Sequence, residues 1–290
     1  MNTSEIKKAL ENTFDFFIQR KVIKQNYLMH TQFIQMGFDG KRKGTEDYWL
    51  KLNHIPKEFS GKKYDECICE EFSISLNNEE RKTIPSLSNW SYTFDPMSGL
   101  GQGNVFGIPH EHFENLKDNK ANAISSEIKY AIYNNFVDYH ALSNVFTMYG
   151  AGIEKIKKIG DKIQHAGAYS KAPINLKNVI REGSVFCNGE ITLELIGLSS
   201  VDGKPCALLK YDSGESTLDM EIISEKGNTK TIGGSQYIGD IYLDLESGWT
   251  RKVMLNEFVI SERKEPNRDK EKMYTVRNLQ IKLISNENLI

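Results

Sequence analysis

Apolar and polar residues alternate along the last third of the chain. In 190–195 and 240–245, isoleucine or leucine fills every second position, and glutamate, threonine, aspartate or tyrosine fills the others. A period of two is typical of a strand with one buried face. It predicts six strands after residue 188, GEITLELIGLSS, KPCALLKYD, ESTLDMEIIS, YIGDIYLDLE, WTRKVMLNEFVISE and MYTVRNLQIKLIS. Turns such as VDGK and DSGE separate several of them, so we predict an antiparallel meander.

The period changes to that of a helix in the middle of the chain. Isoleucine or phenylalanine recurs at 124, 128, 132 and 136, and His140 continues the series. This spacing predicts a helix over 123–148. Four isoleucines between glycines predict a second helix over 151–166. Polar capping residues followed by an apolar stripe predict a third helix near the N-terminus, over 4–26.

These patterns divide the 290 residues into segments of one domain: an N-terminal helix (1–26), a β-rich lobe (27–122), a helical pair (123–167) and a β-meander (168–290). Strands and helices do not alternate, which argues against a Rossmann or TIM-barrel architecture. We therefore predict an α+β fold. A curved antiparallel sheet, forming a half-barrel or a nearly closed barrel, packs on two or three helices. The N-terminal helix covers one end of the sheet or mediates a homodimer.

The stretch GGSQYIGDIYLDLESGWTRKVMLNEFVISE (233–262) has a strand written G-x-I-Y-L-D-L, an E-S-G turn and an amphipathic return strand. It resembles the LolA-like and LppX-like lipid carriers, and EGSVFCNGEITLELIGLSSVDGKPCALLKYD looks like the opening strands of their meander. The resemblance covers roughly the last 110 residues and consists of strands and turns, so it assigns no site residue. It implies a strongly curved sheet that half-wraps one or more helices, with an apolar ligand between them.

Composition and charge narrow the range of partners. Lysine and arginine total 37 against 39 acidic residues, for a net charge of −2 without a basic stripe. A nucleic-acid partner is therefore not expected. No apolar run approaches the roughly 18 residues of a membrane span, and the N-terminus lacks a signal-peptide core. The four cysteines have no C-x-x-C spacing and are typical of reduced thiols. We expect a cytoplasmic protein, unless a removed signal sequence once directed its export.

Two histidines in NVFGIPHEHFENLKD (104–118) form the first candidate site. If this segment is extended, His110 and His112 share one face, about 7 Å apart, and could bind one Zn²⁺ or Fe²⁺ ion. His140 supplies the third ligand if its helix crosses the strand, and Glu114 is the alternative. Without a metal, the same three histidines could act as general acids or bases. The simpler interpretation is that His110 and His112 are surface histidines or form hydrogen bonds within a loop.

An aromatic pocket is the second candidate feature. Its predicted lining consists of Trp90, Tyr92, Phe94, Phe106, Phe136 and Trp249. Core packing is the competing interpretation, because large aromatic side chains dominate protein interiors. The glycine-rich run SGLGQGNVFG matches neither common phosphate-binding pattern, so it is interpreted as a turn or lid.

Two functions of different classes follow. The first is binding of a small hydrophobic or amphipathic molecule in a cavity between the curved sheet and the helices. The second is a cytoplasmic enzyme that uses the same pocket with a His-ligated metal or a His general acid–base. The missing export signal favours the enzyme. The missing nucleophile motif, such as G-x-S-x-G, favours the binding protein. Both hypotheses remain open at the level of sequence.

Overall fold

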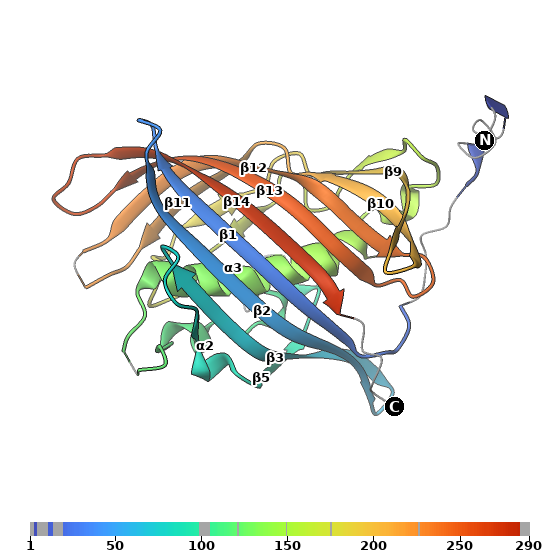
Figure 1. The fold of residues 1–290 in the computed structure, drawn as a ribbon, viewed down its shortest axis with the longest axis horizontal. Coiled ribbons are helices and arrows are strands. Elements are labelled where there is room, and N and C mark those ends of the chain that lie inside the picture. Colours follow the sequence, from blue (N-terminus) through green and yellow to red (C-terminus); the bar gives the residue numbers. More distant parts are fainter. Residues whose placement is uncertain are drawn as a thin grey trace.

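One antiparallel sheet and one long helix, α3 (Ser126–Ser143), dominate the fold (Figure 1). The computed structural model describes residues 3–4, 11–13, 20–98, 105–120, 122–148, 150–174, 176–225 and 227–284. The other helical elements within these residues are short, namely η1 (Pro85–Leu87), η3 (Val105–Gly107), α2 (Glu111–Glu114), η4 (Val145–Thr147) and η5 (Ile153–Lys155). No helix in the described ranges has both the length and the apolar character needed to cross a membrane.

The sheet contains 14 described strands. They are β1 (Gln25–Gly37), β2 (Arg42–Phe59), β3 (Lys62–Leu76), β4 (Lys82–Thr83), β5 (Trp90–Phe94), β6 (Lys162–Gln164), β7 (Lys171–Pro173), β8 (Val185–Cys187), β9 (Thr192–Val201), β10 (Lys204–Asp212), β11 (Ser216–Ile222), β12 (Thr229–Asp244), β13 (Thr250–Lys264) and β14 (Glu271–Ile284). Ten of them follow the order β4-β3-β2-β1-β14-β13-β12-β10-β9-β6. The other four lie off this path: β5 pairs with β3, β11 pairs with β12 and β8, and β8 also pairs with β7. Because β1 pairs with β14, the N-terminal strands and the C-terminal strands form one continuous sheet.

The expected packing on two or three helices is wrong, because α3 is the one long helix in the described chain. The segment predicted as a helix over 151–166 forms η5 and β6 instead. Gly152 and Gly160 adopt left-handed backbone conformations there (φ 116° and 94°), which interrupt a helix. β6 then pairs with β9, so tertiary pairing overrides the isoleucine spacing. Most of the predicted N-terminal helix lies outside the described residues, and Gln25 and Asn26 belong to β1.

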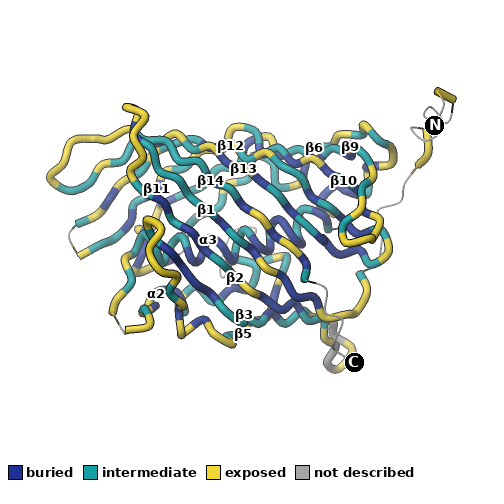
Figure 2. Tube along the Cα trace, in the orientation of Figure 1, coloured by how far each residue is buried: buried dark blue, intermediate teal, exposed yellow. Residues whose placement is uncertain are grey.

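The helix predicted over 123–148 is confirmed in its central part. The Ser125 hydroxyl accepts a hydrogen bond from the Ile128 backbone N–H and caps the helix start. Ile132, Phe136 and His140 are all fully buried, as the four-residue spacing predicts. Figure 2 shows buried and more exposed positions alternating along the long strands, which is the pattern of a sheet with one dry face.

A buried ion-pair cluster ties α3 to the sheet. Arg277 on β14 donates from Nη1 to Asp138 Oδ2 on α3 at 2.6 Å, and its Nε lies 2.7 Å from Glu257 Oε2 on β13. The side chain of Arg277 is 2% exposed. Burial raises the pKa of both carboxyl groups, and the charge of Arg277 opposes that rise. If α3 moved away from the sheet, Arg277 would lose Asp138 and leave a buried charge unpaired, which is costly. The cluster therefore stabilises the position of α3 on the sheet.

The close approach of β12 and β13 at Gly239 allows the register of these two strands to be tested. A Cβ atom added there would overlap the Met254 carbonyl oxygen on β13, whereas one added at Gly197 meets no described atom within 4 Å. We expect Gly239→Ala to lower the free energy of unfolding by about 1–3 kcal/mol. Gly197→Ala should change it by no more than about 0.5 kcal/mol. Urea denaturation of both variants measures the difference, and equal effects would contradict this register.

Candidate metal centre

His140 lies near the C-terminal end of α3 and is fully buried. Its Nε2 is 2.6 Å from the Tyr92 hydroxyl, and its ring stacks on Phe94 with centroids 4.4 Å apart. Its Nδ1 is buried and finds no hydrogen-bond partner within the described part of the chain. Buried polar atoms of this kind are rare, because each loses its hydration without compensation.

Three neighbouring strands place the other side chains of the site. His54 on β2 and Tyr92 on β5 both lie directly opposite Cys67 on β3. The pairing of β2 with β3 shifts by one residue after Lys51. Lys51 pairs with Glu71 and Leu52 pairs with Cys69, so Glu70 of β3 is an extra residue without a partner on β2. This bulge reverses the alternation of β3 and directs the Cys67 side chain into the interior.

His54 is held from two sides. Its Nε2 lies 2.7 Å from Asp65 Oδ2, and its Nδ1 lies 3.8 Å from Cys67 Sγ. The Tyr139 hydroxyl is 3.5 Å from the same Nδ1. His54 and Cys67 are both fully buried, so neither side chain is in contact with bulk solvent.

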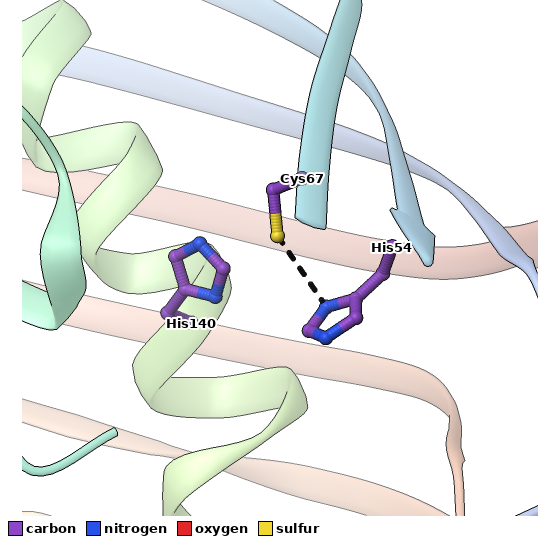
Figure 3. A group of neighbouring side chains, drawn as sticks. All are labelled: His54, Cys67 and His140. Atoms are coloured by element: carbon purple, nitrogen blue, oxygen red, sulfur yellow. Dashed lines mark hydrogen bonds between the residues drawn. The ribbon is translucent and has the colours of Figure 1, made fainter. Parts of the chain in front are cut away.

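His54, Cys67 and His140 therefore converge from β2, β3 and α3. One ligand atom from each lies within 4.8 Å of the others. Figure 3 shows the three side chains pointing toward one another. Two imidazole nitrogens and a thiol are donors that zinc, copper and related ions prefer. The sequence separations of 13 between His54 and Cys67 and 73 between Cys67 and His140 are not those of a short motif.

Burial sets the protonation of the metal-free cluster. It raises the pKa of the Cys67 thiol well above its usual range, so the thiol keeps its proton. It lowers the pKa of His54 and, more strongly, that of His140, so both rings are neutral at neutral pH. Burial opposes ionisation of Asp65 too, but the hydrogen bond with His54 holds the pKa of Asp65 below its usual value.

Trp249, which lies between β12 and β13, and the residues before β1 cover this cluster. Trp249 is 1% exposed and meets the His54 ring edge-on, with centroids 5.1 Å apart. Its indole Nε1 donates to the Lys21 carbonyl at 2.9 Å. The Arg20 guanidinium lies over the Trp249 ring and donates to Asn144 at the end of α3. This cover places a positive charge close to the site.

The structure brings His140, but not the other two predicted ligands, into the cluster. Residues 105–107 and 111–114 form η3 and α2, so the extended segment expected around them does not form. His112 stacks on Trp90 at 4.4 Å and donates from Nε2 to the Ser86 carbonyl. His110 precedes α2. Glu114, the alternative ligand, accepts a hydrogen bond from Asn178.

The aromatic residues predicted to line a pocket gather beside α3. Four ring pairs among them have centroid distances between 4.8 and 6.3 Å, namely Trp90–Tyr92, Trp90–Phe136, Tyr92–Phe136 and Phe94–Phe106. The rings pack against one another, as in a protein core. Binding of an apolar ligand among them stays a prediction. The sixth of these residues, Trp249, covers His54.

A depression lies away from the buried cluster, at the end of the sheet where β1 and β13 end and β14 begins. Its volume is about 370 Å³, and its lining is formed by Phe38, Ile232, Ile260, Ser261, Glu262 and Lys272. The three apolar side chains are about half exposed. None of these six residues belongs to the aromatic pocket predicted from the sequence.

His165 is a separate buried histidine and gives a pH prediction. It is 4% exposed, and burial lowers its pKa to about 4. The unfolded chain, with a histidine pKa of about 6.5, therefore binds this proton first as the pH falls. Stability contributed by neutral His165 is present above pH 6.5 and is lost as the pH falls towards 4.

We expect this difference to cost the metal-free protein about 2 kcal/mol of unfolding free energy between pH 7 and pH 5. Buried His54 and His140 add losses of the same sign. His165→Gln should weaken the pH dependence while leaving those contributions in place. Urea titrations at the two pH values measure this change, and an unchanged dependence in the variant would contradict it.

No family model and no curated protein sequence matches the chain. A functional assignment therefore depends on the geometry of the residues themselves.

Proposed function

We propose that the protein binds one thiophilic transition-metal ion through Nδ1 of His54, Sγ of Cys67 and Nδ1 of His140. The observation that carries this proposal is the way the two rings are held. Asp65 engages Nε2 of His54, and the Tyr92 hydroxyl engages Nε2 of His140. Metal-binding histidines are typically oriented by such a contact on the nitrogen that does not bind the ion.

The unsatisfied Nδ1 of His140 supports the same proposal. In a purely structural core, this buried nitrogen would stay without a partner among the described residues. A bound ion would use its lone pair. It would also bind Cys67 as a thiolate, because metal coordination displaces the thiol proton.

The donor set restricts the class of ion. Ca²⁺ and Mg²⁺ prefer oxygen ligands, whereas zinc and copper accept imidazole and thiolate. None of the three side chains is exposed, so a substrate molecule could not reach the ion without a rearrangement. We therefore propose a binding or stabilising role for the metal rather than a catalytic one.

The small-molecule carrier function stays a separate prediction, as do the relationship to LolA-like carriers and the homodimer. The carrier function is supported by the packing of α3 on the sheet and by the depression lined by Phe38, Ile232 and Ile260. Neither observation identifies a ligand. The metal centre has the stronger support, because it has defined donor atoms.

Metal retention by purified protein tests the proposal. Metal-free, reduced protein would be equilibrated without oxygen with Zn²⁺, Co²⁺ or Cu⁺, freed of unbound ion by gel filtration and analysed for metal content. We expect one equivalent of at least one of these ions and a raised melting temperature. His140→Leu should lose the ion, whereas His112→Gln should keep it. If none of the three ions is retained by the wild-type protein, the proposal is wrong.

A further inference from the structure

This inference rests on the proposed metal binding by His54, Cys67 and His140. The number of ligand atoms at that site limits which ion it can bind. The group found among the described residues contains three donors, two histidines and one cysteine. Zn²⁺ in structural sites is almost always bound by four ligands, and open zinc sites complete the set with water. Asp65 cannot be the fourth while it holds Nε2 of His54 on the far side of the ring.

Water and phenols are also poor candidates for a fourth ligand. All three donors are fully buried beneath aromatic rings, including Phe94 and Trp249. The Tyr92 and Tyr139 hydroxyls are close, but Tyr92 already contacts Nε2 of His140, and Tyr139 lies 3.5 Å from Nδ1 of His54. Neutral phenols also bind a divalent ion less strongly than a carboxylate does. The site therefore suits an ion that is stable with three ligands.

Charge favours a monovalent ion. Arg20 lies over the Trp249 ring, which contacts His54, and Asp65 contacts His54 from another side, so one positive and one negative charge flank the cluster. The remaining site is neutral before the metal enters. Cu⁺ with the Cys67 thiolate keeps it neutral, whereas Zn²⁺ with one thiolate adds a positive charge near Arg20. A net charge in a fully buried site carries a large desolvation cost.

We propose that His54, Cys67 and His140 form a trigonal site that selects Cu⁺ over Zn²⁺. Two histidines with one cysteine in a trigonal arrangement are also the equatorial ligands of known copper sites. In the binding step, Cu⁺ forms a bond to Cys67 Sγ, and the thiol proton passes to the solvent buffer. The oxidation state of the copper does not change, so no additional oxidant or reductant is required.

Competition between the two ions tests this inference. Anaerobic protein loaded with one equivalent of Cu⁺ would be challenged with a tenfold excess of Zn²⁺, and both metals would be measured after gel filtration. We expect Cu⁺ to stay at one equivalent, and Cys67→Ser to lose it. Displacement by Zn²⁺, or retention of Zn²⁺ but not Cu⁺, would overturn the inference and leave the proposed metal binding intact. Retention of neither ion, nor of Co²⁺, would overturn both.

A variant of Arg20 tests the charge argument. Arg20→Met keeps an unbranched apolar chain over Trp249 and removes the positive charge. We expect dissociation constants, measured with chelators of known affinity, to show a larger gain in affinity for Zn²⁺ than for Cu⁺. Equal changes for the two ions would contradict the charge argument.

Discussion

Replacing Cys67 with serine should abolish metal binding, from one ion per chain to none. The serine hydroxyl has nearly the shape of the thiol, but it does not ionise at neutral pH and is a hard oxygen donor. Two neutral histidines alone would then have to hold the ion. The expected readouts are the metal content after gel filtration and the loss of metal-dependent stabilisation in a thermal melt.

Cys69→Ser is the matched control. Cys69 lies on the same strand and is also fully buried, but it is not part of the three-donor group. Each substitution places a hydroxyl in the core, so both should lower the free energy of unfolding. Only Cys67→Ser should also lose the metal ion. Equal metal content in the two variants would show that Cys67 is not a ligand.

Replacing Arg277 with methionine should lower the free energy of unfolding by about 3–5 kcal/mol at pH 7. The substitution removes the positive charge that lies between Asp138 and Glu257 and leaves one buried and one largely buried carboxyl group without it. Urea denaturation measures the loss. Lys204→Met is the control, because it breaks the exposed pair of Lys204 with Glu246 and should cost less than about 1 kcal/mol.

The pH dependence of Arg277→Met provides a second readout. Burial raises the folded-state pKa of Asp138 and Glu257, and loss of Arg277 removes the interaction that lowers it. The folded variant then holds protons that the unfolded chain releases above about pH 4. Its stability should therefore fall as the pH rises and partly recover on acidification. A deficit of unfolding free energy that is the same from pH 5.5 to pH 8 would contradict this explanation.

His140 and His54 show how far sequence patterns lead towards the site. His140 continues the four-residue series of Ile132 and Phe136, which predicted its inward position correctly. His54 continues an equally regular series on β2, since Tyr48, Leu50 and Leu52 all face the interior. This alternation predicts an inward His54, whereas the short spacing of His110 and His112 predicts a shared strand face that the structure does not form.

Cys67 could not be found in the same way. Alternation from Phe72 and Ile74 places Cys67 on the opposite face of β3, and the bulge at Glu70 reverses that assignment. Nothing in the local sequence marks the bulge. Pairing with both β2 and β5 is a long-range property, so the meeting of His54, Cys67 and Tyr92 depends on the folded register.

The sheet was predicted better than the helices. Strict alternation and turn residues identify strands locally, which is why the six C-terminal strands could be predicted. The predicted meander is wrong at one connection, because β10 pairs with β12 and not with β11. The segment at 151–166 has helical isoleucine spacing, but its glycines and its partner strand β9 decide the outcome. Pairing of β1 with β14 joins opposite ends of the described chain, and no local pattern reports such a contact.

X-ray absorption at the edge of the bound metal tests the central claim most directly. The protein would be loaded with one equivalent of the ion that it retains. We predict a first shell of one sulfur, at about 2.2–2.3 Å, and two imidazole nitrogens at about 2.0 Å. A shell without sulfur, or with two or more sulfurs, would contradict binding by His54, Cys67 and His140.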